Sequence, residues 1–261
     1  MRTYAEHLDT WEEFDRLGFD GVGFRLGRRS HKGPLRGNLV ERMGDSLAVR
    51  LARLDTCGVS DALDQLGLDG AVQGLRPMWA CPRIAGQVIT VRLHRADPGE
   101  QGARHLGTAA IEAGGPGQVI VIEHHDREDA AGWGGILSLA ARLKGIEGVV
   151  VDGTCRDVDD SRDAGFPVYA RAATPMTARG RVSEASMGEL IRVSDLPVHH
   201  GDYVIADWSG VVFIQAAHAE EVVATAESLA AREAAMAEAV RAGRSVVEVM
   251  GASYESMLGR Y

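Results

Sequence analysis

Three features of this sequence predict an α/β fold. Short apolar runs rich in β-branched residues, Val119–Ile122 and Val149–Val151, are typical of strands buried on both faces of a sheet. The segment between them, Ile136–Lys144, has its apolar residues at helical spacing. A helix between two buried strands is the pattern of a βαβ unit, whose strands are parallel.

The composition limits the classes of function. The 261 residues are 45% hydrophobic, enough to bury a sizeable core. The formal net charge of −9 argues against a nucleic-acid partner, which would require a clustered basic face. No apolar run approaches membrane-spanning length, so we expect no membrane partner. Cys57, Cys81 and Cys155 lack CxxC spacing, which favours free thiols in a reducing cytoplasm over a zinc site or disulfides.

The scarcity of lysine bears on mechanism. The basic residues are nearly all arginine, and the chain has only Lys32 and Lys144. Schiff-base chemistry needs a desolvated lysine with a lowered pKa. Lys32 lies in a polar, glycine-flanked segment and Lys144 ends a predicted helix, where a cation suits the helix dipole. Neither is predicted to be a catalytic amine.

Before and within the predicted βαβ unit, the order of elements follows from local signals. We expect an N-terminal extension over 1–44 and two short helices over 46–66, the second starting at Ser60-Asp61. Asp61 is then either a helix cap or an acid of the site. Ile84–Leu93 is predicted as a strand in which Gly86 marks a bend or close packing, and His105–Glu112 as a short helix.

The second half of the chain predicts mainly hairpins and one long helix. A strand is expected at Gly165–Ala170, a hairpin within 178–193, and another hairpin joining 203–206 to 211–214. His218–Ala242 forms the longest predicted helix, and Glu233 falls on its apolar stripe. A carboxylate there is either an ion-pair partner or a functional acid. Residues 246–261 are predicted to form a short helical tail after a main domain over 45–245.

A dense group of charges follows the Val149–Val151 run. Four acids, Asp152, Asp157, Asp159 and Asp160, surround the single cation Arg156 within nine positions. A strand that ends in acids beside one arginine suggests a divalent cation and an anionic small molecule that share one site.

Two other segments are candidates for ligand binding. Gly134-Gly135 opens the predicted helix Ile136–Lys144, and a helix N-terminus offers free N–H groups to a carboxylate or phosphate. The βαβ arrangement would bring this glycine pair close to Arg156-Asp157. His124-His125-Asp126 could ligate a metal, but adjacent rings point to opposite sides of an extended chain, which favours solvated loop residues.

Taken together, these stretches resemble the RraA-like family, which includes divalent-metal-dependent 4-hydroxy-4-methyl-2-oxoglutarate/4-carboxy-4-hydroxy-2-oxoadipate aldolases and a non-enzymatic ribonuclease regulator. The resemblance runs in consistent order over roughly residues 45–245. The matching stretches are Ser60–Leu63, Gly86–Val91, Gly134–Leu137, Ala140-Ala141, Gly148–Gly153, Arg156-Asp157, Asp160, Phe166–Val168, Gly201-Asp202, Ala206-Asp207 and Gly210–Val212.

The resemblance implies a three-layer β/β/α swivelling-type domain that forms a homotrimer or hexamer with sites between subunits. It implies that Asp157 and Asp160 hold Mg²⁺ or Mn²⁺ and that Arg156 stabilises a pyruvate enolate. The amides of the loop at Gly134, Gly135, Ile136 and Leu137 would bind the substrate carboxylate, and Glu233 would reach in from an adjacent subunit. The expected function is a lyase acting on a 2-oxo acid, by retro-aldol cleavage or oxaloacetate decarboxylation.

One position departs from the family pattern. The aldolases usually carry an acid twenty-one positions before the arginine, and this chain has Gly135 there. The loss of that acid would either weaken metal binding or transfer proton handling to Asp61, Asp152 or Glu233. The regulator branch lacks the aspartate that follows the arginine, so Asp157 favours an enzyme. The alternative is a non-catalytic regulator that binds a protein partner such as a ribonuclease.

Overall fold

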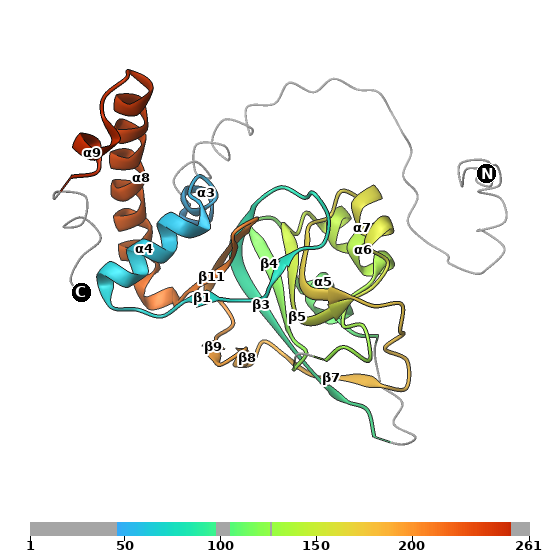
Figure 1. Ribbon diagram of the computed structural model, residues 1–261. Helices are drawn as coiled ribbons and strands as arrows, with labels where there is room; N and C mark the ends of the chain where they lie inside the picture. Colours follow the sequence, from blue (N-terminus) through green and yellow to red (C-terminus); the bar gives the residue numbers. More distant parts are fainter. Residues whose placement is uncertain (1–45, 98–104, 126, 252–261) are drawn as a thin grey trace, which may run out of the picture. The chain divides into compact units, whose positions relative to one another are not determined.

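The structure, a computed structural model, describes residues 46–97, 105–125 and 127–251. Within these residues a mixed sheet runs in the order β1-β11-β10-β3-β4-β5-β6-β2, with β7 paired to β3 (Figure 1). The strands are β1 Ala71–Val72, β2 Arg76–Pro77, β3 Ile84–Arg95, β4 Gln118–Glu123, β5 Gly148–Cys155, β6 Val168–Ala173, β7 Val182–Met187, β8 Ile191–Val193, β9 Leu196–Val198, β10 Tyr203–Asp207 and β11 Gly210–Ile214. The helices are α3 Leu47–Leu51, α4 Thr56–Leu66, α5 Thr108–Ala113, α6 Gly135–Lys144, α7 Val158–Asp163, α8 Ala219–Arg241 and α9 Val246–Val249.

The centre of the sheet is parallel, which confirms the predicted α/β class. Strands β3, β4, β5 and β6 are neighbours and all run in the same direction. Their carboxyl ends therefore lie at one edge, where parallel sheets bind ligands. Gly86 in β3 reflects close packing, because a Cβ there would lie 2.6 Å from the Gly117 carbonyl oxygen.

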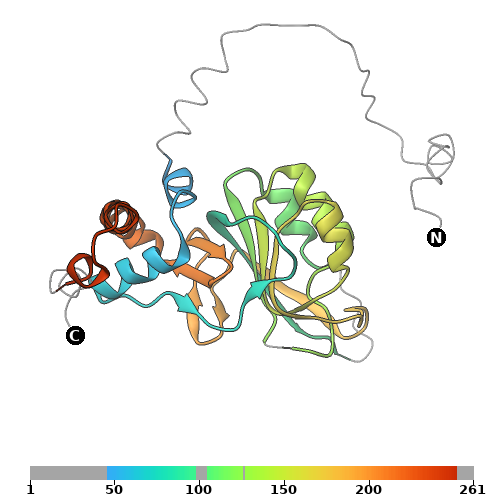
Figure 2. The ribbon, with the colours of Figure 1, turned by 45° about the horizontal axis from the view of Figure 1, so that its top comes forward.

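Successive side chains of the central strands enter two different cores. Ile120, Ile122 and Val149 pack on one face with residues of α5 and α6. Val119 and Val121 pack on the other face with the β8–β9 hairpin. This alternation follows from the two-residue period of a strand. It produces a helix layer, the main sheet and a small second sheet, in agreement with the expected β/β/α layering (Figure 2).

A third core joins α3, α4 and α8 to strands β10 and β11 at the other end of the sheet (Figure 1). The long helix was predicted correctly, but its apolar stripe is buried only as far as Leu229. Among the described residues after Leu229, none is fully buried. The distal half of α8 and α9 thus contribute no buried side chain to the described part of the chain.

Several predicted boundaries were wrong, for physical reasons. Helix α4 begins at Thr56, because the Asp55 carboxylate caps the helix by accepting from the Gly58 N–H at 2.8 Å. Asp61 is therefore an interior residue of α4 and not a cap. Residues 182–187 do not form half of a local hairpin, since β7 pairs with distant β3, and the hairpin in this region is β8–β9.

Other differences from the predictions concern the acidic segment and the ends of the chain. Helix α7, which begins directly after Asp157, was missed because its six residues are too short to show periodicity. The predicted extension 1–44, Lys32, Asp126 and residues 252–261 of the predicted tail lie outside the described residues. No helix in the described ranges is long and apolar enough to cross a membrane.

Asp152 lies within a strand and supports the second sheet. It is a buried residue of β5 whose carboxylate accepts from Arg171 Nε at 2.8 Å and from the Ser194 N–H at 2.7 Å. Ser194 lies in the turn between β8 and β9 and has a positive φ of 52°. Asp152 therefore connects the main sheet to the hairpin and is not a loop residue of the acidic cluster.

Substitution Asp152→Ala should lower the free energy of unfolding by about 2–3 kcal/mol, since it removes a buried acceptor of charge-assisted hydrogen bonds. Denaturant unfolding measures the change. Asp195→Ala, an exposed position in the same turn, is the matched control and should leave stability nearly unchanged. Equal stability of the two variants would contradict this role.

Candidate active site

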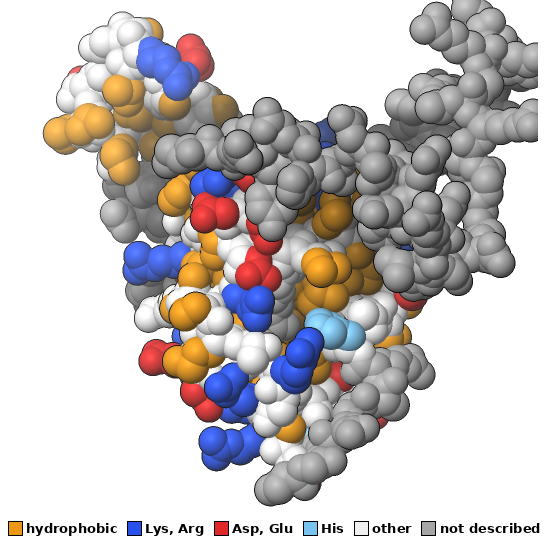
Figure 3. All heavy atoms as spheres, turned by 90° about the vertical axis from the view of Figure 1, so that its right-hand side faces the viewer, with side chains coloured by type: hydrophobic (Ala, Val, Ile, Leu, Met, Phe, Trp, Pro, Cys, Tyr) orange, Lys and Arg blue, Asp and Glu red, His pale blue; other side chains and the backbone are white. Residues whose placement is uncertain are grey.

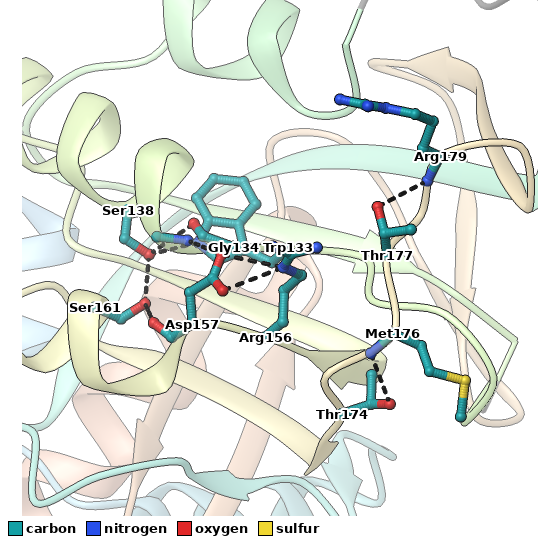
Figure 4. Close-up of polar contacts among 11 residues, drawn as sticks. Trp133, Gly134, Ser138, Arg156, Asp157, Ser161, Thr174, Met176, Thr177 and Arg179 are labelled. Carbon is teal, nitrogen blue, oxygen red and sulfur yellow. Dashed lines mark hydrogen bonds and ion pairs between the residues drawn. The ribbon is translucent and has the colours of Figure 1, made fainter.

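Two segments meet at the carboxyl edge of the parallel strands. The Gly132 N–H donates to the Thr154 carbonyl at 2.8 Å, and the Arg156 N–H donates to the Trp133 carbonyl at 2.9 Å. These bonds hold the residues that lead into α6 beside the end of β5. The predicted meeting of the Gly134-Gly135 turn with Arg156-Asp157 is confirmed (Figure 4).

Asp157 occupies an unusual backbone position at the start of α7. Its φ of 55° and ψ of 45° are left-handed, a region that asparagine and aspartate tolerate better than most residues. An N-terminal aspartate commonly caps its own helix, yet Asp157 makes no such bond. Its Oδ2 instead accepts from the Gly135 N–H at 3.2 Å and from Arg156 Nε at 3.1 Å. The carboxylate is thus directed toward the first turn of α6.

The two glycines permit the close approach of α6 to α7. A Cβ on Gly134 would lie 2.9 Å from Asp157 Oδ2. A Cβ on Gly135 would lie 2.6 Å from the Cβ of Asp160 and 2.8 Å from its Oδ2. The contact between a Cβ on Gly135 and the Cβ of Asp160 is closer than packed carbon atoms tolerate. The side chain of Asp160 thus occupies the space that a side chain at position 135 would need, which accounts for the absence of an acid there.

Buried hydroxyl groups also connect α6 to the start of α7. Trp133 Nε1 donates to Ser138 Oγ at 2.9 Å, and Ser138 Oγ lies 2.8 Å from Ser161 Oγ. Ser161 Oγ donates in turn to the Asp157 carbonyl at 3.1 Å (Figure 4). This network connects α6 to the N-terminus of α7. Sequence reasoning missed both serines, although a serine between Leu137 and Leu139 in an apolar helix was a signal that a buried partner was needed.

The donor set suits a hydrated divalent cation. The carboxylates of Asp157 and Asp160 both lie against Gly135. Mg²⁺ typically uses one or two protein carboxylates and completes its shell with water and substrate oxygens. Asp157 and Asp160 are therefore compatible with a Mg²⁺ or Mn²⁺ ion that keeps several waters. Among the described residues no group of three or more His, Cys, Asp or Glu side chains could hold a metal ion.

The predicted acids Asp61 and Glu233 lie together, but elsewhere in the chain. They come from α4 and α8, which pack in the third core, whereas α6 belongs to the first core. Partial loss of hydration raises the pKa of Glu233, and the charges of Asp55 and Asp61 raise it further. Burial likewise raises the pKa of Asp61, with Asp64 and Asp55 adding to the effect. Glu233 is exposed rather than held in an apolar seam, and it forms no ion pair with a described residue, so the ion-pair alternative is not supported there.

Comparison with known proteins identifies the family. Residues 56–213 match the family model described as RraA-like, Aldolase/RraA. The chain belongs to the RraA-like family. The match contains Asp61, the Gly134–Leu137 turn and Arg156 to Asp160, while Glu233 lies beyond it.

Individual relatives agree with this assignment. Protein DlpA of Legionella pneumophila is 30% identical over 190 residues, which are 71% of this chain, and the chain spans only 30% of that protein's length. A Thermus thermophilus protein named 4-hydroxy-4-methyl-2-oxoglutarate aldolase is 30% identical, over 51% of this chain and 76% of that protein. An uncharacterized protein from Pseudomonas syringae pv. tomato has a similar structure, with a TM-score of 0.71, 27% identity, and coverage of 78% of this chain and 96% of that one.

The remaining candidates have structural explanations. His124 is buried with Nε2 2.6 Å from the Ala130 carbonyl oxygen, and burial lowers its pKa, so the prediction of a solvated residue was wrong for His124. His125 is exposed, as expected, and lies in a turn with a positive φ of 53°. The three cysteines are free thiols, and burial raises the pKa of Cys155 to about 12. Lys144 forms an exposed ion pair with Glu112 at 2.7 Å.

Substitution Gly135→Ala should destabilise the protein by about 1–3 kcal/mol, because the added methyl group overlaps Asp160. An ordinary helical glycine would gain stability from the same change. Thermal unfolding measures the effect. Gly115→Ala is the matched control, since a Cβ there meets no atom within 4 Å. A Gly135→Ala variant as stable as the control would show that α6 and α7 are not in close contact.

Substitution Glu233→Gln should stabilise the protein at neutral pH. Because the pKa of Glu233 is raised in the folded chain, its ionisation costs more in the folded than in the unfolded state. This cost is absent below the ordinary pKa of glutamate, about 4.3, and is fully present above the folded-state pKa. The melting temperature of Glu233→Gln should therefore exceed that of the parent near pH 7, and the difference should vanish at acidic pH. Glu238→Gln, which removes an exposed ion pair with Arg241 on the same helix, should give no such gain.

Proposed function

We propose that this protein is a divalent-metal-dependent lyase that acts on a 2-oxo acid through a pyruvate enolate. The observation that carries the proposal is the convergence of two carboxylates, Asp157 and Asp160, with the Arg156 guanidinium at the start of α6. Such a site combines groups for a cation with groups for an anion. Relatives named as aldolases of 2-oxo acids support the same chemistry.

Different residues would bind the keto oxygen and the carboxylate of the substrate. Asp157 and Asp160 would hold Mg²⁺ or Mn²⁺, which when bound supplies Lewis-acid charge for the keto oxygen. The Ile136 and Leu137 N–H groups in the first turn of α6 have no acceptor within the helix and would bind the substrate carboxylate. The Gly135 N–H, which donates to Asp157 Oδ2 in this structure, would join them if the Asp157 carboxylate turned to a metal ion. Arg156 would donate to the keto oxygen as it gains negative charge.

Both candidate reactions reach the same enolate. In retro-aldol cleavage, the C4 hydroxyl loses its proton, the C3–C4 bond breaks, and the electron pair moves onto the C2 keto oxygen. In decarboxylation of oxaloacetate, the C3–C4 bond breaks with loss of CO₂. Protonation at C3 then releases pyruvate in either case. No lysine is needed, in keeping with the ion-paired Lys144.

Proton transfer would require a second copy of the chain. Asp61 and Glu233, whose pKa values are raised by partial burial, are candidates for this role, but they lie on α4 and α8, apart from Arg156 within one chain. Beside the site, α6 exposes an apolar stripe in which Ile136 is 85%, Leu139 52% and Leu143 80% accessible (Figure 3). We propose that this stripe packs against a neighbouring subunit in a homotrimer or hexamer, and that the neighbour contributes the acid.

Purified protein supplied with Mg²⁺ or Mn²⁺ should release pyruvate from oxaloacetate and from 4-hydroxy-4-methyl-2-oxoglutarate. Asp157→Ala should reduce kcat/KM by at least about 100-fold, the scale for removing one group that stabilises developing charge. Asp159→Ala is the matched control, because Asp159 lies on the same helix with its side chain 83% exposed and paired to Arg162. A lactate dehydrogenase-coupled assay measures pyruvate.

Undiminished pyruvate release by Asp157→Ala would refute the site assignment. Failure of the parent protein to bind either metal in calorimetry, together with co-purification of a ribonuclease, would favour the alternative of a non-catalytic regulator.

A further inference from the structure

The loop after β6 lies beside the site as a third segment. The Thr174 N–H donates to the Cys155 carbonyl at 2.8 Å, one residue before Arg156. Further along, the Met176 carbonyl accepts from the Ala131 N–H at 3.1 Å, three residues before Gly134. The loop 174–179 is thus hydrogen-bonded to both segments that form the candidate site, and Figure 4 shows it rising beside Arg156.

Short-range hydrogen bonds define the shape of this loop. The Thr174 hydroxyl accepts from the Met176 N–H at 3.4 Å, and the Thr177 hydroxyl accepts from the Arg179 N–H at 3.2 Å. Arg181 Nη1 donates to the Thr177 carbonyl at 2.9 Å. Hydroxyl-to-backbone bonds of this type stabilise turns. The backbone at Arg179 is therefore held in place relative to the site.

The loop carries one cation whose charge is not neutralised by a neighbouring acid. Arg127 pairs with Asp129 at 2.8 Å and Arg156 contacts Asp157 at 3.1 Å, but the exposed Arg179 forms no ion pair with any carboxylate in the described residues. In Figure 4 its side chain extends from the loop toward the side of the view on which Trp133 lies. The planar guanidinium group of an arginine can donate two parallel hydrogen bonds to the two oxygens of a carboxylate.

We propose that Arg179 binds the distal carboxylate of a dicarboxylic 2-oxo acid whose 2-oxo acid end is held at Arg156 and the start of α6. This assignment rests on the proposed lyase function and adds to it a residue that selects the substrate. A substrate of this class carries negative charge at both ends, and the two arginines lie on loops that follow adjacent parallel strands, β5 and β6. Arg179 is a binding residue and takes no part in bond breaking.

The proposal distinguishes the two candidate reactions. In cleavage of 4-hydroxy-4-methyl-2-oxoglutarate the distal carboxylate persists in the product, so a bond to Arg179 costs nothing as the reaction proceeds. In oxaloacetate decarboxylation the distal carboxylate leaves as CO₂, and a bond to Arg179 stabilises the reactant and opposes its loss. Arg179 should therefore support cleavage much more than decarboxylation.

The test compares Arg179→Met with the parent protein in two assays. For cleavage of 4-hydroxy-4-methyl-2-oxoglutarate, KM should rise about 10-fold to 100-fold, the range expected for loss of a hydrogen bond to a charged group, with little change in kcat. Oxaloacetate decarboxylation should not fall. Arg179→Lys should restore part of the affinity. Arg162→Met, which removes an exposed arginine of α7 paired with Asp159, is the matched control and should leave both reactions unchanged.

Ligand binding provides a readout that does not depend on turnover. Calorimetry with 2-oxoglutarate, which has a distal carboxylate, and with 2-oxobutanoate, which lacks one, should show that Arg179→Met weakens only the former. Equal affinity of parent and variant for 2-oxoglutarate, or equal losses for both ligands, would overturn the proposal. If binding shows the expected selectivity but the parent cleaves neither substrate, the lyase function fails while the assignment of Arg179 stands.

Discussion

The candidate site depends on one contact, the approach of the first turn of α6 to the first turn of α7. Gly134 and Gly135 allow it, because a Cβ on Gly135 would lie only 2.6 Å from that of Asp160. The buried hydroxyls of Ser138 and Ser161, 2.8 Å apart, fix the two helices in register. Close packing at the two glycines and the two serines thus fixes the position of α6 relative to α7, although the contact is small. The orientation of the Asp157 carboxylate follows from this contact.

The arrangement of charge explains why one chain contains only part of the proposed chemistry. The groups suited to anions and cations, Arg156 and Asp157, lie on the helix layer of the sheet, whereas the acids with raised pKa, Asp61 and Glu233, lie on α4 and α8, which pack in a separate core. In the proposed function, assembly of two or more subunits would bring the two sets of groups together.

The sequence predicted what local patterns and chain order control, and it failed where distant contacts decide. Val149–Val151 and Ile136–Lys144 had clear periods, so the parallel strands and the meeting of Gly135 with Asp157 were predicted correctly. The pairing of β7 with β3 was missed, because no local signal identifies a distant partner. Asp152 appeared to belong to the acidic cluster, since the direction of its side chain depends on Arg171 and Ser194. The roles proposed for Arg156 and Asp160 come from the resemblance to the family and not from a local pattern.

The contact between positions 135 and 160 has an evolutionary consequence. Since a Cβ at 135 and the Cβ of Asp160 compete for one volume, position 135 cannot gain a side chain while position 160 carries one in this arrangement. A lineage that acquired an acid on α6 would need a glycine at 160 or a displaced α7. The two positions should therefore covary among relatives. The pair of residues at positions 135 and 160, rather than either one alone, should indicate whether α6 or α7 of a given relative carries the second carboxylate of the site.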